Sequence, residues 1–303
     1  MKKKVVVTGG AGFIGSHVVD ALVERGDEVH VVDNYVGGKR EDQLNAKAMY
    51  NEVDIRTTDE LKRIFIEADV VFHLAALPRV AYSVEHPVET TDTNVRGTVS
   101  VLTAAAHAKV RRVVYAASGS AYGNQEIMPL SENMSANPVN PYGLQKYVGE
   151  LFMKVWVTVY GLQTVSLRYF NAYGPRLDPT GPYALAVGAF LLARKEGRPM
   201  KIFGDGTVTR DYTHVSDIVR ATLLASDSMN VGGGEVINVG TGRNRTIQSL
   251  AEMVGGEIVY APPRVEAHDS QANNKKAREL LGWEPRVSLE DGIAELKKLF
   301  NIS

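Results

Sequence analysis

The chain contains no cysteine among its 303 residues. This absence excludes disulfide bonds, thiolate nucleophiles and cysteine-rich metal sites, and it is typical of proteins from a reducing cytoplasm. The formal net charge is −1, so the chain has no overall positive field that would attract nucleic acid or an anionic membrane. The histidines form no metal-ligand pattern, and His17 and His73 are predicted to be structural. We therefore expect neither a nucleic-acid partner nor a metal site.

Long apolar runs are also missing. The start, "MKKKVVVTGG", resembles a signal peptide, but its apolar run covers only 5–7 before glycines follow, which is too short for a signal core. No stretch approaches the roughly 20 apolar residues that a membrane span needs. The composition, 44% hydrophobic and 23% charged residues, is typical of globular domains. The sequence thus predicts a soluble, cytoplasmic protein that does not enter a membrane.

What the chain does have is a regular alternation of short apolar runs with longer segments of helical spacing. Runs rich in β-branched residues predict buried strands at 4–8, 28–33, 69–75, 111–118 and 163–170. Segments with helical spacing lie between them, at 16–25, 92–109 and 141–160. Because right-handed crossovers put helices on both faces of such a sheet, this pattern favours a doubly wound parallel α/β fold over residues 1–170.

The character of the chain changes after residue 170. The stretch "NAYGPRLDPTGPYA" is dense in proline, glycine and turn-forming residues and is predicted to be a loop. Short predicted strands follow ("MKIFG", "EVINVG", "EIVYAPP"), mixed with short helices. We interpret residues 171–303 as a smaller mixed α/β substrate lobe, in which "THVSDIVRATLLAS" packs back on the main sheet. No flexible linker is visible, so the two lobes should form one unit with a cleft between them.

A glycine-rich turn follows the first predicted strand. In "VVVTGGAGFIGSHVVDAL" the glycines at 9, 10, 12 and 15 lie between a strand and a helix, where a dinucleotide-binding turn requires them. Small residues there allow a tight turn and let a pyrophosphate approach backbone N–H groups at the positive end of the helix. The second strand ends at Asp33, about 20 residues further on, where a carboxylate can accept hydrogen bonds from the adenosine ribose. An acidic residue repels a 2′-phosphate, so NAD is favoured over NADP.

Two Tyr–Lys pairs have the same four-residue spacing. Tyr35 and Lys39 lie in a glycine-containing loop. Outside a helix, four-residue spacing does not bring two side chains to the same face, so this pair is not a catalytic candidate. Tyr142 and Lys146 follow Asn140, a good N-cap, and a proline suited to the first helical position, so they should lie one turn apart on a helix. A nearby cation, the positive helix end and an oxidised nicotinamide would together bring the pKa of Tyr142 from about 10 toward neutrality and make it a usable base.

These motifs carry a family resemblance. "TGGAGFIGSH", "DVVFHLAA", "SGSAYG", "NPYGLQK" and "LRYFNAYGPR" occur in this order. They resemble the extended short-chain dehydrogenase/reductase superfamily, and within it the NAD-dependent sugar-nucleotide epimerase/dehydratase group. The likeness continues through "GDGTVTRDYTHVSD", "INVGTG" and "KARELLGWEP", nearly to the end of the chain.

The resemblance implies roles for individual residues. Tyr142 would be the base, Lys146 would hold the nicotinamide ribose and tune Tyr142, and Ser118 would hydrogen-bond the reacting hydroxyl. The residues expected to contact NAD, besides Tyr142 and Lys146, are Gly9, Gly12, Phe13, Ile14, Gly15, Asp33, Asn34, Asp54, Ile55, Leu74, Ala75 and Ala76. Within this set, Asn34 would assist Asp33. The family often has a lysine shortly after the fourth strand, where this chain reads "LPRV", with Pro78 or Arg79 in its place.

The resemblance also bears on the reaction. Dehydratases of the family carry Asp-Glu directly after the position of Ser118, and decarboxylating relatives usually keep a glutamate there, whereas this chain has Gly119 and Ser120. Relatives that deprotonate a carbon next to a carbonyl commonly use a cysteine, which this chain lacks. The resemblance therefore implies 4-epimerisation of a UDP-hexose (UDP-galactose or UDP-glucose) through a 4-keto intermediate, with NAD retained through turnover.

Substrate contacts are implied in the same way. Asn171, Arg210 and Arg264 match positions that hold the diphosphate, and guanidinium groups suit phosphate oxygens. Counting from Arg264 places Ser270 beside the 2-substituent of the sugar, where a small residue leaves room for an N-acetyl group. The surrounding "RVEAHDSQ" departs from the usual R-x-G-D pattern, so an ordinary loop position for Ser270 stays open.

Two alternatives to this function stay open. One is an epimerase or a 4-reductase that acts on a different nucleotide sugar, and the other is a non-catalytic NAD-sensing scaffold. Segments 92–108 and 141–160 resemble the helices that form the dimer interface in the family, which implies a homodimer, although their apolar content is equally consistent with burial under the second lobe.

Overall fold

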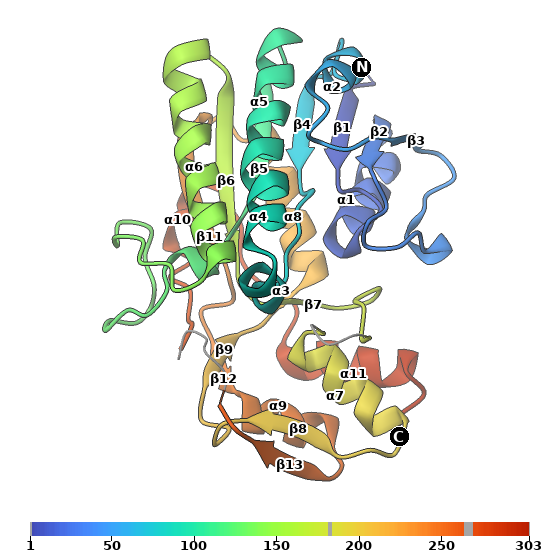
Figure 1. Ribbon diagram of the computed structural model, residues 1–303, viewed down its shortest axis with the longest axis vertical. Coiled ribbons are helices and arrows are strands. Elements are labelled where there is room, and N and C mark those ends of the chain that lie inside the picture. Colours follow the sequence, from blue (N-terminus) through green and yellow to red (C-terminus); the bar gives the residue numbers. More distant parts are fainter. Residues whose placement is uncertain (1, 181–183, 264–268, 303) are drawn as a thin grey trace.

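A seven-stranded parallel sheet forms the centre of the molecule (Figure 1). The computed structural model describes residues 2–180, 184–263 and 269–302. The strand order is β11-β6-β5-β4-β1-β2-β3, and every neighbouring pair is parallel. The strands are β1 (Lys4–Thr8), β2 (Glu28–Asp33), β3 (Met49–Glu52), β4 (Val70–His73), β5 (Arg112–Ser118), β6 (Gln163–Tyr169) and β11 (Gly233–Val239). This confirms the predicted doubly wound fold.

Helices cover both faces of this sheet. One face carries α1 (Phe13–Glu24), α8 (Val215–Asp227) and α10 (Lys275–Leu281), and the other carries α2 (Thr58–Ile64), α5 (Gly97–His107) and α6 (Pro141–Tyr160). Alternate residues of a strand point to opposite faces. Accordingly, Val5 and Val7 belong to the core on the α1 side, whereas Val6 belongs to the core on the α5 side. The near-continuous apolar runs of the sequence follow from burial on both faces.

Two strands of the sheet differ from the sequence-based expectation. β3 was not predicted, because its sequence MYNE is exposed at both ends and contains no apolar run. β11 was expected in the smaller lobe, but it pairs with β6 at the edge of the main sheet. The local sequence of β11 encodes an extended conformation, while its partner strand is decided by long-range packing. The segment 213–226 does return to the main sheet as predicted, since α8 packs on α1, β5 and β6.

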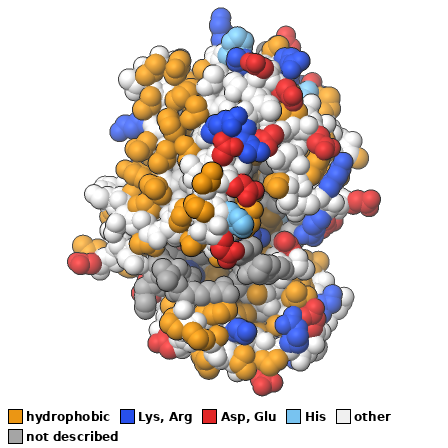
Figure 2. All heavy atoms as spheres, in the orientation of Figure 1, with side chains coloured by type: hydrophobic (Ala, Val, Ile, Leu, Met, Phe, Trp, Pro, Cys, Tyr) orange, Lys and Arg blue, Asp and Glu red, His pale blue; other side chains and the backbone are white. Residues whose placement is uncertain are grey.

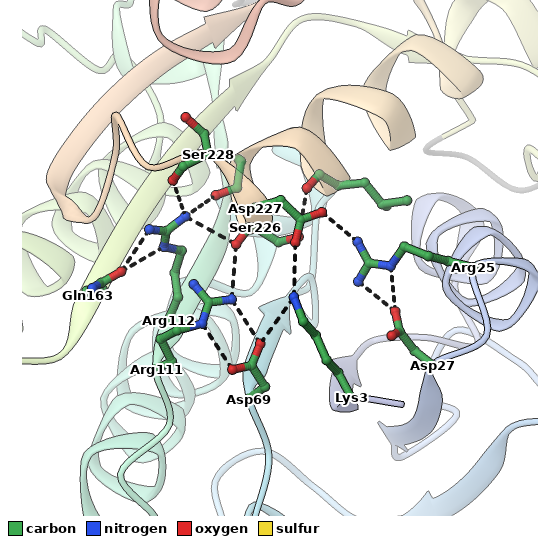
Figure 3. A network of polar contacts seen from close by, with 12 residues as sticks. Lys3, Arg25, Asp27, Asp69, Arg111, Arg112, Gln163, Ser226, Asp227 and Ser228 are labelled. Atoms are coloured by element: carbon green, nitrogen blue, oxygen red, sulfur yellow. Dashed lines mark hydrogen bonds and ion pairs between the residues drawn. The ribbon is translucent and has the colours of Figure 1, made fainter. Parts of the chain in front are cut away.

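The amino ends of the strands are tied to α8 by a polar network (Figure 3). Arg112, at the start of β5, donates to the carbonyl oxygens of Ala225 (2.9 Å) and Ser228 (2.7 Å) at the end of α8 and to that of Val231 (2.7 Å). A cation suits the negative end of a helix, and here it also satisfies carbonyl groups that have no partner within the helix. This network holds α8 against the amino ends of the strands, which lie on the side of the sheet away from the smaller lobe.

The smaller lobe lies beyond the carboxyl ends of the strands (Figure 1). Its own core is formed by α7 (Ala186–Lys195), β8 (Met200–Phe203), α9 (Ile247–Val254), β13 (Ile258–Ala261) and α11 (Leu289–Leu299). Two short strand pairs connect it to the sheet: β7 (Ala172–Tyr173) with β10 (Thr213–His214), and β9 (Thr209–Asp211) with β12 (Asn244–Thr246). In open α/β sheets, ligands bind at the carboxyl ends of the strands. We therefore expect the ligand-binding site where these ends face the smaller lobe.

The chain between β4 and α6 completes this edge of the molecule. It contains α3 (Val80–Glu85), α4 (Pro87–Thr91), a π-helical stretch at Asp92–Arg96 that continues into α5, and a 3-10 turn at Gly119–Ala121. A further 3-10 turn, Glu41–Gln43, follows β2. No helix in the described ranges is long and apolar enough to span a membrane.

Candidate active site

The glycine turn between β1 and α1 is packed too tightly for side chains. Gly9 has φ +72°, and a Cβ added to it would lie 2.6 Å from the amide nitrogen of Ala75. A Cβ on Gly15 would lie 2.0 Å from the carbonyl oxygen of Gly9. The N-cap residue of α1, Gly12, provides no side-chain acceptor, so the first amides of the helix point outward without a capping group. This arrangement fits a pyrophosphate that is bound by backbone N–H groups.

Asp33 at the end of β2 connects the turn to the neighbouring strand. Its carboxylate accepts hydrogen bonds from the amides of Ala11 (3.0 Å) and Tyr35 (2.8 Å). Burial raises the pKa of Asp33, and these two bonds oppose that effect. Each oxygen keeps a further lone pair, so the group can still accept ribose hydroxyls. Asn34 donates to the carboxylate of Asp54 (3.0 Å), so its expected role beside Asp33 stays a prediction.

The residues expected near the adenine and ribose line the ends of β3 and β4. Asp54 forms a two-bond ion pair with Arg56 (2.9 and 2.7 Å), which lowers the pKa of Asp54 to about 2. Ile55 is buried in the core on the α5 side, so only its backbone can reach a ligand. The amide of Leu74 donates to the carbonyl of Thr8 (3.1 Å), which continues the β1–β4 ladder beside the glycine turn. Phe13, Ile14, Leu74, Ala75 and Ala76 are all partly exposed along this edge.

Tyr142 and Lys146 lie one turn apart on α6, whose start is as predicted. Asn140 caps the helix by accepting the amide of Gly143 (2.8 Å), and a proline takes the first helical position. The side chain of Tyr142 is half-buried, and its hydroxyl lies close enough to Ser118, at the end of β5, for that side chain to influence its pKa. Lys146 is buried, and its Nζ donates to the carbonyl of Ala116 (2.8 Å). The structure thus brings the three predicted catalytic residues together at the carboxyl end of β5.

Burial dominates the electrostatics of this cluster in the chain alone. Burial raises the pKa of Tyr142 to about 12, and the hydrogen bond with Ser118 and the charge of Arg79 only partly oppose that effect. Burial also lowers the pKa of Lys146 to about 7, while Glu150 raises it. In the chain alone, desolvation outweighs the neighbours that favour the phenolate of Tyr142. The expected shift of its pKa toward neutrality includes the charge of an oxidised nicotinamide, so it stays a prediction.

The expected substrate residues converge only in part. Asn171, held at φ +31°, donates to the carbonyl of Asp211 (2.9 Å) and to the hydroxyl of Ser270 (3.2 Å). The two predicted residues Asn171 and Ser270 are therefore direct neighbours. Arg210 lies in β9 opposite Arg245 of β12 and donates to the carbonyl of Thr209 (2.9 Å). Arg264 lies outside the described residues.

One residue that organises this region was missed at the level of sequence. Asp211 is fully buried and accepts hydrogen bonds from the amides of Thr241 (2.8 Å), Gly242 (2.9 Å) and Ala272 (3.0 Å). It therefore fixes the glycine loop after β11 and the segment around Ser270 against β9. The motif "TRDY" contains this aspartate, but nothing in the local sequence distinguishes a buried aspartate from an exposed one.

The fold and the carboxyl ends of the strands define a dinucleotide-binding protein of the Rossmann class with a Tyr–Ser–Lys cluster. Residues 5–240 match the model of the NAD dependent epimerase/dehydratase family. The chain therefore belongs to this family, which confirms the predicted family and the predicted cofactor, NAD. Within the described residues, no group of three or more His, Asp or Glu side chains could hold a metal ion.

Individual relatives indicate the type of enzyme within this family. The UDP-glucose 4-epimerase of Mycolicibacterium smegmatis is 39% identical over 311 residues, which cover 98% of each chain. The UDP-glucose 4-epimerase of Thermotoga maritima, solved with UDP-glucose, has a TM-score of 0.94 and 41% identity, with 98% of each chain covered. A UDP-N-acetylglucosamine 4-epimerase of Methanobrevibacter ruminantium, solved with UDP-N-acetylmuramic acid, has a TM-score of 0.93 and 34% identity, with 99% of each chain covered. The protein is an NAD-dependent isomerase of the UDP-sugar 4-epimerase family.

Proposed function

We propose that the enzyme interconverts UDP-glucose and UDP-galactose, and also accepts their N-acetylated forms, through a 4-keto intermediate. The placement of Tyr142 close to Ser118, with Lys146 one helical turn away, carries this proposal. A phenol that exchanges a proton with a sugar hydroxyl provides all the acid–base chemistry that oxidation and re-reduction at one carbon require. Similarity to 4-epimerases of both sugar types supports the range of substrates.

Several residues are suited to hold the cofactor. The outward amides at the start of α1 would bind the pyrophosphate, the carboxylate of Asp33 the adenosine ribose, and Lys146 the nicotinamide ribose with the two N–H donors that Ala116 does not use. Bound NAD supplies the acceptor and donor of hydride at the sugar C4. Its positive nicotinamide also favours the phenolate of Tyr142.

In the proposed reaction the chain itself moves one proton. The Tyr142 phenolate takes the proton of the 4-hydroxyl as the carbon is oxidised, and the same phenol returns it once the opposite face of the 4-keto sugar is reduced. Ser118 accepts the amide of Ser120 (3.1 Å), which orients its hydroxyl toward Tyr142 and the substrate.

The direct test is proton NMR of the anomeric signals, with UDP-glucose and UDP-N-acetylglucosamine in separate tubes and no added NAD. We expect the galacto anomer to appear from both substrates. Tyr142→Phe should lower the rate by at least about 100-fold, the usual contribution of a general acid–base group, whereas Tyr147→Phe on the same helix should not. Formation of a 4-keto sugar with one NADH released for each added NAD consumed would instead indicate a 4-reductase.

Sugar specificity is proposed to depend on Ser270. Its small side chain is held by Asn171 and by the amide of Asp211 (3.4 Å), so it takes little space beside the predicted diphosphate residues. Ser270→Tyr should remove activity on UDP-N-acetylglucosamine and leave the rate with UDP-glucose within a few-fold of wild type. An equal loss with both substrates would show that Ser270 is only a loop residue.

We also propose a homodimer that forms through α6. Large hydrophobic side chains form an exposed stripe along this helix, visible in Figure 2: Leu144, Leu151, Val155, Val159 and Tyr160. Contiguous apolar surface of this kind marks an interaction site more often than it is left free. Light scattering should give twice the chain mass for the wild type and a single chain mass for Val155→Asp.

The cytoplasmic location of the protein stays a prediction.

A further inference from the structure

A short turn after β7 is bonded to both elements that flank the proposed NAD site. The amide of Leu177 donates to the carbonyl of Gly174 (3.3 Å) and closes this turn. Tyr173 and Leu177, on either side of it, are buried in the core of the smaller lobe. The two residues between Gly174 and Leu177, Pro175 and Arg176, are instead bonded to the nucleotide-binding domain. The turn therefore joins the two parts of the molecule.

The first contact of the turn is with α1, the helix that begins at the glycine turn. Nε2 of His17 donates to the carbonyl of Pro175 (2.8 Å), and Nη2 of Arg176 forms an ion pair with the carboxylate of Asp20 (2.7 Å). His17 and Asp20 are three residues apart and so lie on the same face of the helix. The other carboxylate oxygen of Asp20 accepts the side-chain amide of Asn45 (2.7 Å). These bonds fix the position of α1, whose first amides would bind the pyrophosphate.

The second contact of the turn is with the chain that follows β2. The carbonyl oxygen of Arg176 accepts Nη1 of Arg40 (3.2 Å) and Nε2 of Gln43 (3.2 Å). Gln43 is buried and belongs to the 3-10 turn that comes shortly after Asp33, whose carboxylate would bind the adenosine ribose. Arg176 thus contacts both elements that carry the proposed NAD contacts, α1 with its side chain and the chain after β2 with its carbonyl.

Two features of Arg176 are unfavourable for stability. Its φ is +66°, in the left-handed region that a long side chain rarely adopts. Its Nη1 is buried, and no acceptor bonds it among the residues that the structure describes; a buried N–H group without an acceptor costs free energy. Backbone strain of this kind persists where surrounding contacts maintain it, and it is found mainly at functional sites. Stability alone therefore does not account for an arginine at this position.

We propose that Arg176 is a positioning residue for the cofactor: it holds α1 and the chain after β2 in the arrangement that binds NAD, and so slows the release of NAD. The inference rests on the cofactor contacts of the proposed function, those at the start of α1 and at Asp33, but not on the identity of the sugar. Elements that are already in place bind a ligand more tightly, because less order has to be imposed on binding. An enzyme that reoxidises its cofactor within each cycle has no need to release it.

The test measures NAD release from the holoenzyme without any sugar nucleotide. Alcohol dehydrogenase and ethanol in excess convert released NAD to fluorescent NADH, so the rise in fluorescence gives the dissociation rate constant. Arg176→Met and Asp20→Ala should each release NAD about tenfold faster, as expected for one lost hydrogen bond to a charged group. Arg176→Lys keeps the charge and should stay within about threefold of wild type. The control Arg25→Met breaks ion pairs with Asp27 and Asp227 at the other end of α1 and should stay within about twofold.

Three results would overturn the proposal. The first is a wild-type release rate for Arg176→Met, or for Asp20→Ala if Arg176→Met does not fold. The second is equally fast release from Arg25→Met, which would mean that any loss of stability frees NAD. The third is a double variant, Asp20→Ala with Arg176→Met, whose effect is the product of the single effects, because paired residues should be non-additive. At saturating NAD, kcat of Arg176→Met should stay within about twofold of wild type. Faster NAD release in a protein that leaves UDP-glucose unchanged would overturn only the proposed reaction.

Discussion

The buried ion pair between Glu150 and Arg168 gives the sharpest stability prediction. The two side chains are 2% and 4% exposed, and they are joined by hydrogen bonds of 2.8 and 2.7 Å between α6 and β6. The guanidinium also lies over the ring of Tyr122, 4.3 Å from its centre, and its Nη1 has no partner. Removal of the glutamate charge would leave a buried, uncompensated cation.

We therefore expect Glu150→Gln to lower the free energy of unfolding by about 3–5 kcal/mol, the usual cost of breaking a buried pair from one side. That is a large part of the roughly 5–15 kcal/mol by which proteins of this kind are stable. The matched control is Glu279→Gln, which removes an exposed i,i+4 partner of Lys275 and should cost less than about 0.5 kcal/mol. Urea denaturation at constant NAD gives both values.

A double variant separates the charge from the packing. Glu150→Leu combined with Arg168→Met removes both charges. The free energy of unfolding of this double variant should lie within about 2 kcal/mol of the wild-type value, because no unpaired charge remains. Glu150 also raises the pKa of Lys146, so Glu150→Gln should take it below about 7 and move the activity optimum toward lower pH. If Glu150→Gln costs no more than Glu279→Gln, the reasoning about the buried pair is refuted.

Three further predictions concern the turn, the core and the remote edge of the sheet. Gly15→Ala should abolish NAD retention, because the new Cβ meets backbone at 2.0 Å, whereas Gly37→Ala, with open space around it, should leave the bound NAD measured by absorbance unchanged. His73 is buried, and burial lowers its pKa from 6.5 to about 3. As the pH falls below 6.5, this histidine is protonated in the unfolded chain but not in the folded one, which favours unfolding. We expect about 2 kcal/mol of stability to be lost from this histidine between pH 7 and 5, and His73→Asn should lack that part of the acid sensitivity in denaturation curves. Arg112→Met leaves the carbonyl groups at the end of α8 without donors and should lower the melting temperature by several degrees, with kcat little changed, since this network is far from the site.

The sequence alone determined the features that local interactions control. The bounds of α6 are as predicted, because its start depends on Asn140 as N-cap and on a proline in the first turn, and its end on Gly161 in the left-handed conformation. The glycine turn was recognisable for the same reason: the close contacts of Gly9 and Gly15 tolerate no other residue type. The five strands rich in β-branched residues followed from burial on both faces.

Tertiary structure decided what depends on distant partners. Whether β11 pairs with β6 or joins the smaller lobe is a choice between partners far apart in sequence, and its own residues suit both. The contact of Asn171 with Ser270 likewise joins two loops that no local pattern connects. The contact of the Lys146 ammonium with the carbonyl of Ala116 likewise joins α6 to β5, which are distant in sequence. Desolvation controls the pKa of Tyr142, and desolvation is a property of the packed surroundings, which spacing along the chain does not express.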